Sequence, residues 1–264
     1  MTLQERIKNP PSFYSLPLWR RVVLICGLGF VVVVGAVSVN KEFDGFKAIS
    51  NLNFYLDRGE MRVIIGPNGA GKSTLMKSAF GLVKIRQGSV TFAGEEITNM
   101  RPDLVVRRGM SYVPQEKNVF PSMTVQENLE MGGYLRKGGI ADKMDHIFQI
   151  FPRLKERRRQ ASGSMSGGER QMVAMGRALM LDPSLILMDE PTAGLSPLFI
   201  EQTFERIIEV NKLGISVLMV EQNAKQALEI AHRGYVLAMG RNRHEDTGEG
   251  LLNNQEIAEM FLGG

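Results

Sequence analysis

The sequence predicts an α/β fold built on a mostly parallel sheet, and three observations support this prediction. A glycine-rich segment, 66–74, lies between an apolar run typical of a buried strand and a segment with helix-forming composition. A second apolar run, 185–188, ends in two carboxylates. Strand patterns alternate with helix patterns over residues 31–114 and 166–240, as in successive parallel strand–helix–strand units.

The glycine-rich segment fits the phosphate-binding motif G-x-x-x-x-G-K-[ST] at every required position. Its glycines allow backbone N–H groups to converge on a β-phosphate, and the following helix N-terminus adds partial positive charge. We expect the Lys72 ammonium to reach the β- and γ-phosphate oxygens and the Ser73 hydroxyl to bind Mg²⁺. The motif therefore predicts a phosphate-loop NTPase core that binds ATP through Gly66, Pro67, Asn68, Gly69, Ala70, Gly71, Lys72, Ser73 and Thr74.

The carboxylates that follow the second apolar run predict hydrolysis. In phosphate-loop enzymes an acidic residue at such a strand end helps to hold Mg²⁺, and Asp189 has this position. Glu190 follows it and is expected to polarise the water that attacks the γ-phosphate, as a general base. Lys72 and Glu190 are accordingly predicted catalytic residues.

Composition and charge are those of a globular enzyme. The chain has 264 residues, a formal net charge of +4 and one cysteine, Cys26, which excludes an internal disulfide and a cysteine-based zinc site. A reducing compartment is the default expectation. The clearest basic cluster, 155–159, is interpreted as a solvated helix face rather than a nucleic-acid patch, so no nucleic-acid partner is predicted.

The N-terminal region allows more than one interpretation. Residues 1–20 contain three prolines and are expected to form a loosely ordered extension. The apolar segment 22–37 is too short for an ordinary transmembrane helix, but it resembles the apolar part of a signal peptide. Buried strand, membrane contact and cleaved signal all stay open, with strand favoured for the second half. We therefore assign residues 1–30 to an extension of uncertain structure and 31–264 to one domain.

A third motif gives the family resemblance. Residues 164–171 read Ser-Met-Ser-Gly-Gly-Glu-Arg-Gln, precede a helical segment and closely resemble the signature motif of ATP-binding cassette (ABC) proteins. A serine and two glycines that open a helix present a hydroxyl, backbone amides and a dipole end to an anion. Ser166, Gly167 and Gly168 are thus predicted to form a second phosphate-binding element. The resemblance runs from about residue 37 to residue 264.

The resemblance also implies roles for smaller motifs. Phe43 matches the aromatic that stacks on adenine, although a core position stays open for it. Gln115 matches the glutamine that touches Mg²⁺ and opens the lobe facing the membrane subunit. Ser196 stands where the family usually has aspartate in the loop that crosses the dimer.

Gln222 is the clearest departure from the family pattern. The family commonly has a histidine after this strand that contacts the γ-phosphate, whereas this chain has a neutral amide that does not titrate. Gln222 is therefore expected to make a weaker, pH-independent catalytic contact. The surrounding segment 220–223 and the segment 119–129 resemble the ATP-binding subunits of branched-chain amino-acid importers.

Residue order predicts how the domain is arranged. A helical lobe of about 115–165 is inserted into the core, and Gly138-Gly139 breaks it into two helical stretches. An antiparallel β portion is expected beside the parallel sheet. The tail 247–264 has the pattern of one short amphipathic helix packed on the body.

Together these features resemble an ATPase subunit that drives uptake of branched-chain or related amino acids. The resemblance implies ATP and Mg²⁺, a head-to-tail pair of ATP-binding subunits of the same or different kind, and transmembrane permease subunits. It also implies an extracytoplasmic solute-binding protein as an indirect partner, and a peripheral position on the cytoplasmic face of the inner (plasma) membrane. The alternatives are an importer ATPase for urea, amides or other polar solutes, and a soluble or regulatory ABC protein.

Overall fold

The core of the molecule is a six-stranded sheet. The computed structural model describes residues 32–43 and 45–262, and its main sheet has the strand order β10-β9-β3-β8-β7-β6. All neighbouring strands are parallel except β10, which runs antiparallel to β9. The strands are β3 (Met61–Ile65), β6 (Met110–Val113), β7 (Leu185–Asp189), β8 (Ser216–Val220), β9 (Arg233–Ala238) and β10 (Arg241–Thr247).

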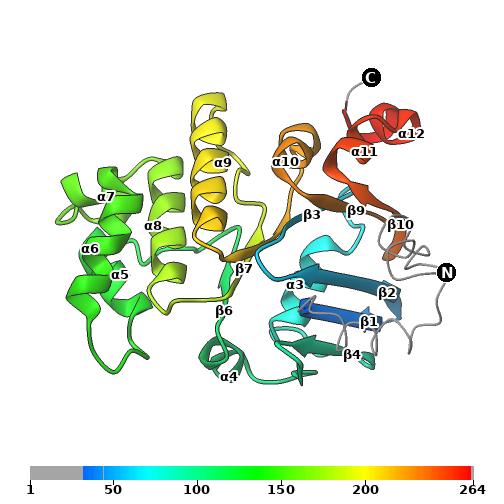
Figure 1. Ribbon diagram of the computed structural model, residues 1–264, viewed down its shortest axis with the longest axis horizontal. Helices are drawn as coiled ribbons and strands as arrows, with labels where there is room; N and C mark the ends of the chain where they lie inside the picture. Colours follow the sequence, from blue (N-terminus) through cyan, green and yellow to red (C-terminus); the bar gives the residue numbers. More distant parts are fainter. Residues whose placement is uncertain (1–31, 44, 263–264) are drawn as a thin grey trace, which may run out of the picture.

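The central strands are buried on both faces, as parallel sheets require. Every residue of β3, β7 and β8 is buried. Along β3, Val63 and Ile65 pack in one hydrophobic cluster while Ile64 packs in the other, on the opposite side of the sheet. The helices around the sheet are α3 (Lys72–Ala79), α4 (Pro102–Arg107), α8 (Gly167–Leu179), α9 (Pro197–Lys212) and α10 (Ala224–Ile230) (Figure 1).

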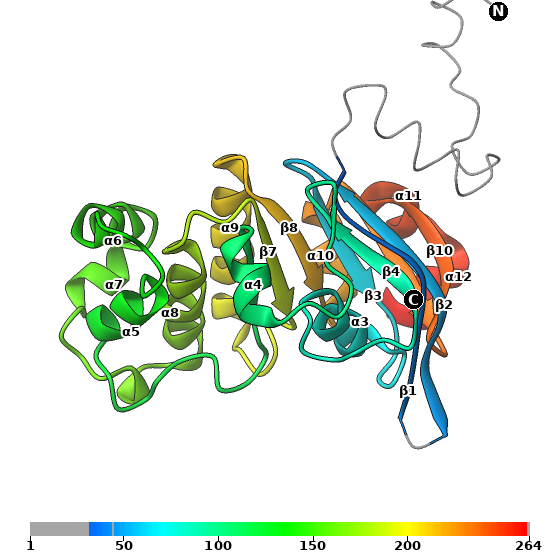
Figure 2. The same cartoon turned by 90° about the horizontal axis from the view of Figure 1, so that it is seen from below.

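A second, antiparallel sheet covers one side of the core. Its order is β2-β1-β4-β5, with strands β1 (Val32–Phe43), β2 (Phe46–Asp57), β4 (Gln87–Phe92) and β5 (Glu95–Glu96) (Figure 2). The strand prediction for the second half of segment 22–37 is therefore confirmed from Val32 onward. The first half of that segment, with Cys26, lies outside the described residues.

Three helices occupy the segment predicted to form the lobe: α5 (Val125–Gly132), α6 (Ile140–Ile150) and α7 (Pro152–Glu156), followed by a short turn, Ser162–Ser164. They lie with α8 at one end of the molecule (Figure 1). Gly139 has a φ of +65° and begins α6, so the glycine pair does separate two helices.

The interpretation of the basic cluster 155–159 as one helix face was wrong. Helix α7 ends at Glu156, so the last three arginines follow the helix. Arg157 lies partly buried and pairs with Glu169 at 3.2 Å, and Arg153 pairs with the same carboxylate at 3.4 Å. Within the cluster, Arg157 therefore pairs with α8, whereas Lys155, Arg158 and Arg159 are exposed.

The C-terminal tail was predicted as one helix, and this was also wrong. It forms α11 (Gly248–Leu252), α12 (Gln255–Ile257) and a final turn, Ala258–Leu262. The break comes at Asn254, whose side-chain oxygen accepts a hydrogen bond from the Ile257 N–H at 3.2 Å and so begins a new helix. Leu251 and Ile257 are buried as the pattern indicated.

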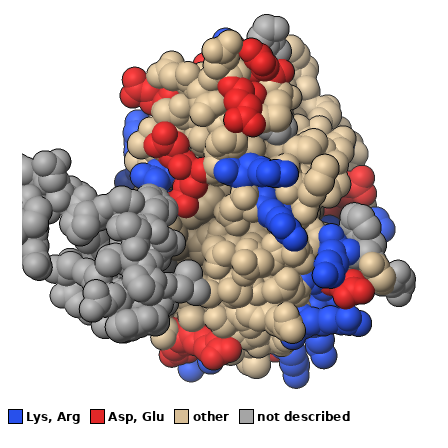
Figure 3. Space-filling view, turned by 90° about the vertical axis from the view of Figure 1, so that its right-hand side faces the viewer, with Lys and Arg blue, Asp and Glu red and all other residues tan. Residues whose placement is uncertain are grey.

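The face at this end of the molecule carries both charge signs. In Figure 3 basic side chains gather mainly on one side, and acidic side chains gather above and below. Arg241 and Arg243 are exposed on β10, the edge strand of the main sheet. Charged side chains on an edge strand discourage pairing with another chain.

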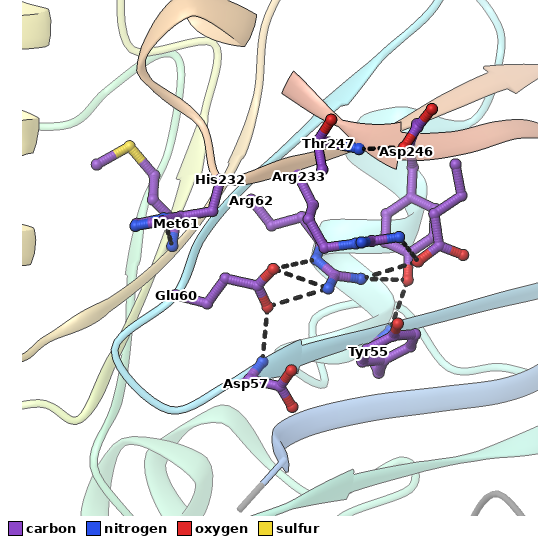
Figure 4. A network of polar contacts seen from close by, with 11 residues as sticks. Tyr55, Asp57, Glu60, Met61, Arg62, His232, Arg233, Asp246 and Thr247 are labelled. Carbon is purple, nitrogen blue, oxygen red and sulfur yellow. Dashed lines mark hydrogen bonds and ion pairs between the residues drawn. The ribbon is translucent and has the colours of Figure 1, made fainter. Parts of the chain in front are cut away.

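A fully buried arginine connects the two sheets. Arg62 on β3 donates to both oxygens of Glu60 at 2.8 and 3.0 Å and to the Tyr235 hydroxyl at 2.6 Å (Figure 4). It also pairs with Glu245 of β10 at 3.2 Å and lies over the Tyr55 ring of β2, 4.2 Å from its centroid. Four segments therefore share one buried cation.

We expect Arg62→Ala to lower the free energy of unfolding by about 3–5 kcal/mol, because it leaves Glu60 without its buried counter-charge. Urea denaturation followed by circular dichroism measures the change. Arg58→Ala is the control, since Arg58 is exposed and should shift stability by only about 0.5 kcal/mol. Equal stability of the two variants would contradict a central role for the Arg62 network.

Candidate functional site: a phosphate-loop pocket

The site is built where four neighbouring parallel strands end. Strands β3, β8, β7 and β6 lie side by side and run in the same direction, so their carboxyl ends meet at one edge (Figure 1). The phosphate loop follows β3, Gln222 follows β8, Asp189 ends β7, and Gln115 follows β6. Ligands of open α/β sheets bind at such an edge.

Two glycines of the loop have no room for a side chain. Gly66 has a φ of +150°, and a Cβ atom there would lie 2.2 Å from the Leu237 carbonyl oxygen. Gly71 has a φ of +94°, begins α3, and a Cβ there would lie 2.5 Å from the Ala48 carbonyl oxygen. Only glycine lets the backbone pass this close, so the loop conformation requires both residues.

Lys72 is folded over the loop. Its Nζ donates to the carbonyl oxygens of Gly66 at 2.8 Å and Pro67 at 3.2 Å. Burial lowers the pKa of the Lys72 ammonium, while the nearby carboxylates of Glu190 and Asp189 act in the opposite direction. The ammonium is thus positioned above the loop, where phosphate oxygens are better acceptors than neutral carbonyl groups.

The loop borders a pocket of about 290 Å³. Loop residues 68–74 line it together with Phe43, Ala48 and Glu190. Phe43 is 43% exposed, and Lys41 lies over its ring with Nζ 4.4 Å from the centroid. The structure therefore contradicts a core position for Phe43 and leaves the ring at the pocket, where an adenine base could stack.

Asp189 is held by two hydroxyl groups. The Ser73 Oγ donates to one carboxylate oxygen at 2.8 Å, and the Tyr112 hydroxyl donates to the other at 2.9 Å. Burial, followed by the charge of Asp189, raises the pKa of Tyr112, so its hydroxyl keeps its proton. We did not predict a role for Tyr112 from the sequence. The available signal was its place on β6, the strand beside Asp189.

The Glu190 carboxylate accepts hydrogen bonds from side chains of two other segments of the site. The side-chain amides of Gln115 and Gln222 both donate to its Oε2, at 2.8 and 2.7 Å. The Glu190 backbone has a φ of +49°, an uncommon conformation for a residue with a side chain. The structure therefore brings together the two glutamines that the sequence placed 107 positions apart, 115 and 222, on one carboxylate oxygen.

Glu221 is a second residue that sequence reasoning missed. It is almost fully buried and accepts from the Thr192 N–H at 3.0 Å, the Thr192 hydroxyl at 2.9 Å and the Gln222 N–H at 3.0 Å. Burial raises the pKa of Glu221, against the lowering effect of these hydrogen bonds. It joins the turn after Glu190 to the turn that carries Gln222, so it orients both.

The signature segment lies outside this pocket. Ser166 begins α8 and exchanges hydrogen bonds with Glu169, its hydroxyl accepting from the Glu169 N–H at 3.3 Å. Ser166 and Gly167 are exposed, and Gly168 packs against Phe199, which leaves no space for a Cβ. None of the three lines the phosphate-loop pocket.

The oxygen ligands that this site offers fit a nucleotide with bound Mg²⁺. The Ser73 hydroxyl, the Asp189 carboxylate and the Gln115 amide offer the oxygen ligands that Mg²⁺ prefers. Within the described residues no group of three or more His, Cys, Asp or Glu side chains could hold a metal by itself. A cation here would therefore need phosphate oxygens to complete its coordination, as is usual for Mg²⁺.

The fold and this site define a nucleotide-binding ATPase of the phosphate-loop class. Comparison with known sequences identifies the family: the profile described as ABC transporter matches residues 49–193. The chain belongs to the ABC transporter family and is an ATPase of that family.

Individual relatives agree with this assignment. The chain is 43% identical to the high-affinity branched-chain amino acid transport ATP-binding protein BraG of Pseudomonas aeruginosa, over 86% of this chain and 98% of that protein. It is 37% identical to a probable branched-chain amino acid transport ATP-binding protein, LivF, of Archaeoglobus fulgidus, over 86% of this chain and 97% of that protein. The solved ADP conformation of MJ1267, an ATP-binding cassette of an ABC transporter, is similar with a TM-score of 0.81 and 28% identity, covering 89% of this chain and all of that one.

We expect Gln222→Ala to lower kcat roughly tenfold, because losing one hydrogen bond from a neutral amide to the Glu190 carboxylate costs on the order of 1–2 kcal/mol. Gln222→His should stay active but gain a pH dependence that the wild-type residue cannot have. A protonated imidazole beside Glu190 makes that carboxylate a weaker base, so kcat should rise as the pH increases through the imidazole pKa.

The measurement is kcat against pH from about 5.5 to 8.5 for wild type and both variants, a range that spans the ordinary histidine pKa. Asn223→Ala on the same turn is the control for a general disturbance. Wild-type kcat in Gln222→Ala would place Gln222 outside the chemistry.

Proposed function

We propose that this chain is the ATP-hydrolysing subunit of an importer for branched-chain or related amino acids. The observation that supports it best is Glu190, held by Gln115 and Gln222 beside a phosphate loop. The names of BraG and LivF support the solute class. Urea, amides and other polar solutes, and a soluble or regulatory role, are the less favoured alternatives.

In the proposed mechanism each side chain of the pocket has one role. The Lys72 ammonium exchanges its two carbonyl acceptors for the β- and γ-phosphate oxygens of ATP. Ser73, Asp189 and Gln115 would hold Mg²⁺, which would supply positive charge next to the phosphate oxygens. Glu190 accepts a proton from the attacking water, and the two amides orient its carboxylate so that one oxygen stays available. Phe43 supports the adenine base.

The signature segment supports a two-subunit mechanism. Ser166 and Gly167 are exposed at the N-terminus of a 13-residue helix, away from the pocket of their own chain. We propose that Ser166, Gly167 and Gly168 bind the nucleotide of a facing ATP-binding subunit, so that two ATP molecules lie between two subunits. Hydrolysis then removes the shared γ-phosphate contacts, and the pair opens.

The face near Phe120, Met123 and Tyr134 is the proposed permease contact. Phe120 is 38% exposed and Tyr134 is 78% exposed, whereas Met123 is half-buried. Exposed large apolar side chains that gather on one face indicate a partner site. No helix among the described residues is long and apolar enough to span the bilayer. The transport names of BraG and LivF support the further proposal of a peripheral position on the cytoplasmic face of the inner membrane, with a solute-binding protein acting on the far side.

Nucleotide binding and hydrolysis should separate in two variants. Lys72→Ala should abolish tight ATP binding because Lys72 contacts the phosphates before reaction, whereas Glu190→Gln should bind ATP normally and stop hydrolysis. Equilibrium binding of ATP and steady-state phosphate release measure the two effects. Glu190→Gln with ATP should also elute as a dimer in gel filtration. Hydrolysis within about tenfold of wild type in Glu190→Gln would remove Glu190 from the base role.

Phe120→Ser should uncouple hydrolysis from transport, since it removes an apolar contact with the permease but leaves the pocket unchanged. The measurement compares solute uptake and permease-stimulated ATPase activity in proteoliposomes, with the ATPase activity of the isolated chain as reference. Leu213→Ser, a similarly exposed apolar residue at the far end of α9, is the matched control. Unchanged uptake and stimulation in Phe120→Ser would show that the docking face is wrong.

A further inference from the structure

A groove of about 180 Å³ lies where the helical segment meets the core, and one of its lining residues, Arg177, has a buried hydrogen-bond donor without a partner. Residues of α4, β6, α8 and the segment after Gln115 line it. Figure 2 shows α4 between the α8 end of the molecule and α3. The groove lies beside the proposed permease contact, because the guanidinium of its lining residue Arg177 covers the Phe120 ring, 4.5 Å from the centroid.

Two donors without partners belong to α8: one is on Arg177, which lines the groove, and the other is on Gln171, which does not. Arg177 Nη1 donates to the Asn118 carbonyl oxygen at 2.7 Å, but Arg177 Nε is buried and has no hydrogen-bond partner. Gln171 accepts from the Asn118 amide at 2.7 Å through Oε1, while its buried Nε2 has no partner. A buried donor without an acceptor is costly, and native structures hold few of them. The Arg177 Nε, which belongs to the groove, therefore calls for an acceptor from outside the described residues.

The charge of the groove specifies the kind of acceptor. Lys117 and Arg177 both line it, and no carboxylate is among its lining residues. Burial lowers the pKa of the Arg177 guanidinium, and no carboxylate of the described residues acts to raise it. Neither cation has an ion pair within residues 32–43 and 45–262.

The positive charge continues into an adjoining pocket. This pocket, of about 450 Å³, shares Val106 with the groove and is lined by Arg107, Arg136 and Lys137. Asp182 pairs with Arg136 at 2.5 Å, whereas Arg107 and Lys137 have no ion pair in the described part of the chain. A partner that covers the groove and this pocket therefore meets a surface with excess positive charge.

We propose that the permease segment docking here carries an Asp or Glu whose carboxylate enters the groove, pairs with Arg177 and accepts from its free Nε. Lys117 at the exposed side of the groove steers the same acidic segment. This inference rests on the proposed function, since it takes the permease as the occupant. It adds the chemistry by which this chain would recognise its own permease among others: charge in the groove beside an apolar anchor at Phe120.

The test measures affinity between the intact chain and its purified permease subunits in detergent. Arg177→Gln and Lys117→Glu should each weaken binding by about tenfold or more, as expected when one partner of an interfacial charge pair is removed. Arg243→Glu on the exposed edge strand β10 is the matched control for a change of charge and should leave affinity unchanged. ATPase activity of each isolated variant reports that the pocket is intact.

A charge exchange identifies the acid directly. Arg177→Glu is combined in turn with each Asp→Arg or Glu→Arg substitution in the cytoplasmic loops of the permease, and one combination should recover most of the lost affinity. If Arg177→Glu fails to fold, Lys117→Glu takes its place in the same exchange.

The outcomes separate this inference from the proposed docking. Wild-type affinity in both Arg177→Gln and Lys117→Glu, with weakened binding in Phe120→Ser, overturns the acidic partner and leaves the docking face standing. Wild-type affinity in all three overturns the docking face itself. Weakened binding in the two charge variants without recovery in any exchange also overturns the proposed ion pair.

Discussion

The carboxylate of Glu190 is the constraint on which the rest of the site depends. Its Oε2 accepts from amides that belong to segments following two different strands, β6 and β8. If either amide moved away, the carboxylate of the proposed base would lose one of these two hydrogen bonds. Because the four strands are parallel and adjacent, the turns that carry these groups emerge at one edge, and the buried Glu221 ties two of them together. Chemistry at the pocket is therefore sensitive to small displacements of either turn.

The same segment that supplies Gln115 continues into the surface proposed for the permease. Lys117, Asn118 and Phe120 follow within five residues, and Asn118 is bonded to α8 through both Gln171 and Arg177. Helix α8 in turn begins at the signature serine, Ser166. One short stretch of chain thus contacts the carboxylate proposed as the base at one end and includes part of the proposed docking face at the other. This arrangement offers a physical route by which the permease could influence hydrolysis.

Asn128 holds that stretch in place. Its side chain is fully buried and bonds to the Phe120 N–H at 2.8 Å and the Phe120 carbonyl oxygen at 3.0 Å, and also to the Ser162 hydroxyl at 3.0 Å. Ser162 belongs to the turn that leads into the signature segment. The proposed docking face and the turn before α8 are therefore both hydrogen-bonded to the Asn128 amide. The Arg62 network connects the two sheets.

The sequence by itself determined the α/β class, the phosphate loop, and the position of Asp189 and Glu190 at a strand end, because these features depend on local residue type and spacing. It also identified Gln222 as unusual, but not its partner. Tertiary structure alone decided that Gln115 and Gln222 share one oxygen, that Tyr112 holds Asp189, and that Phe43 is exposed. It also decided that the tail breaks at Asn254 and that Arg157 of the basic cluster pairs with Glu169 of α8. Such features depend on contacts between segments far apart in the chain, which only the packing of parallel strands brings to one edge.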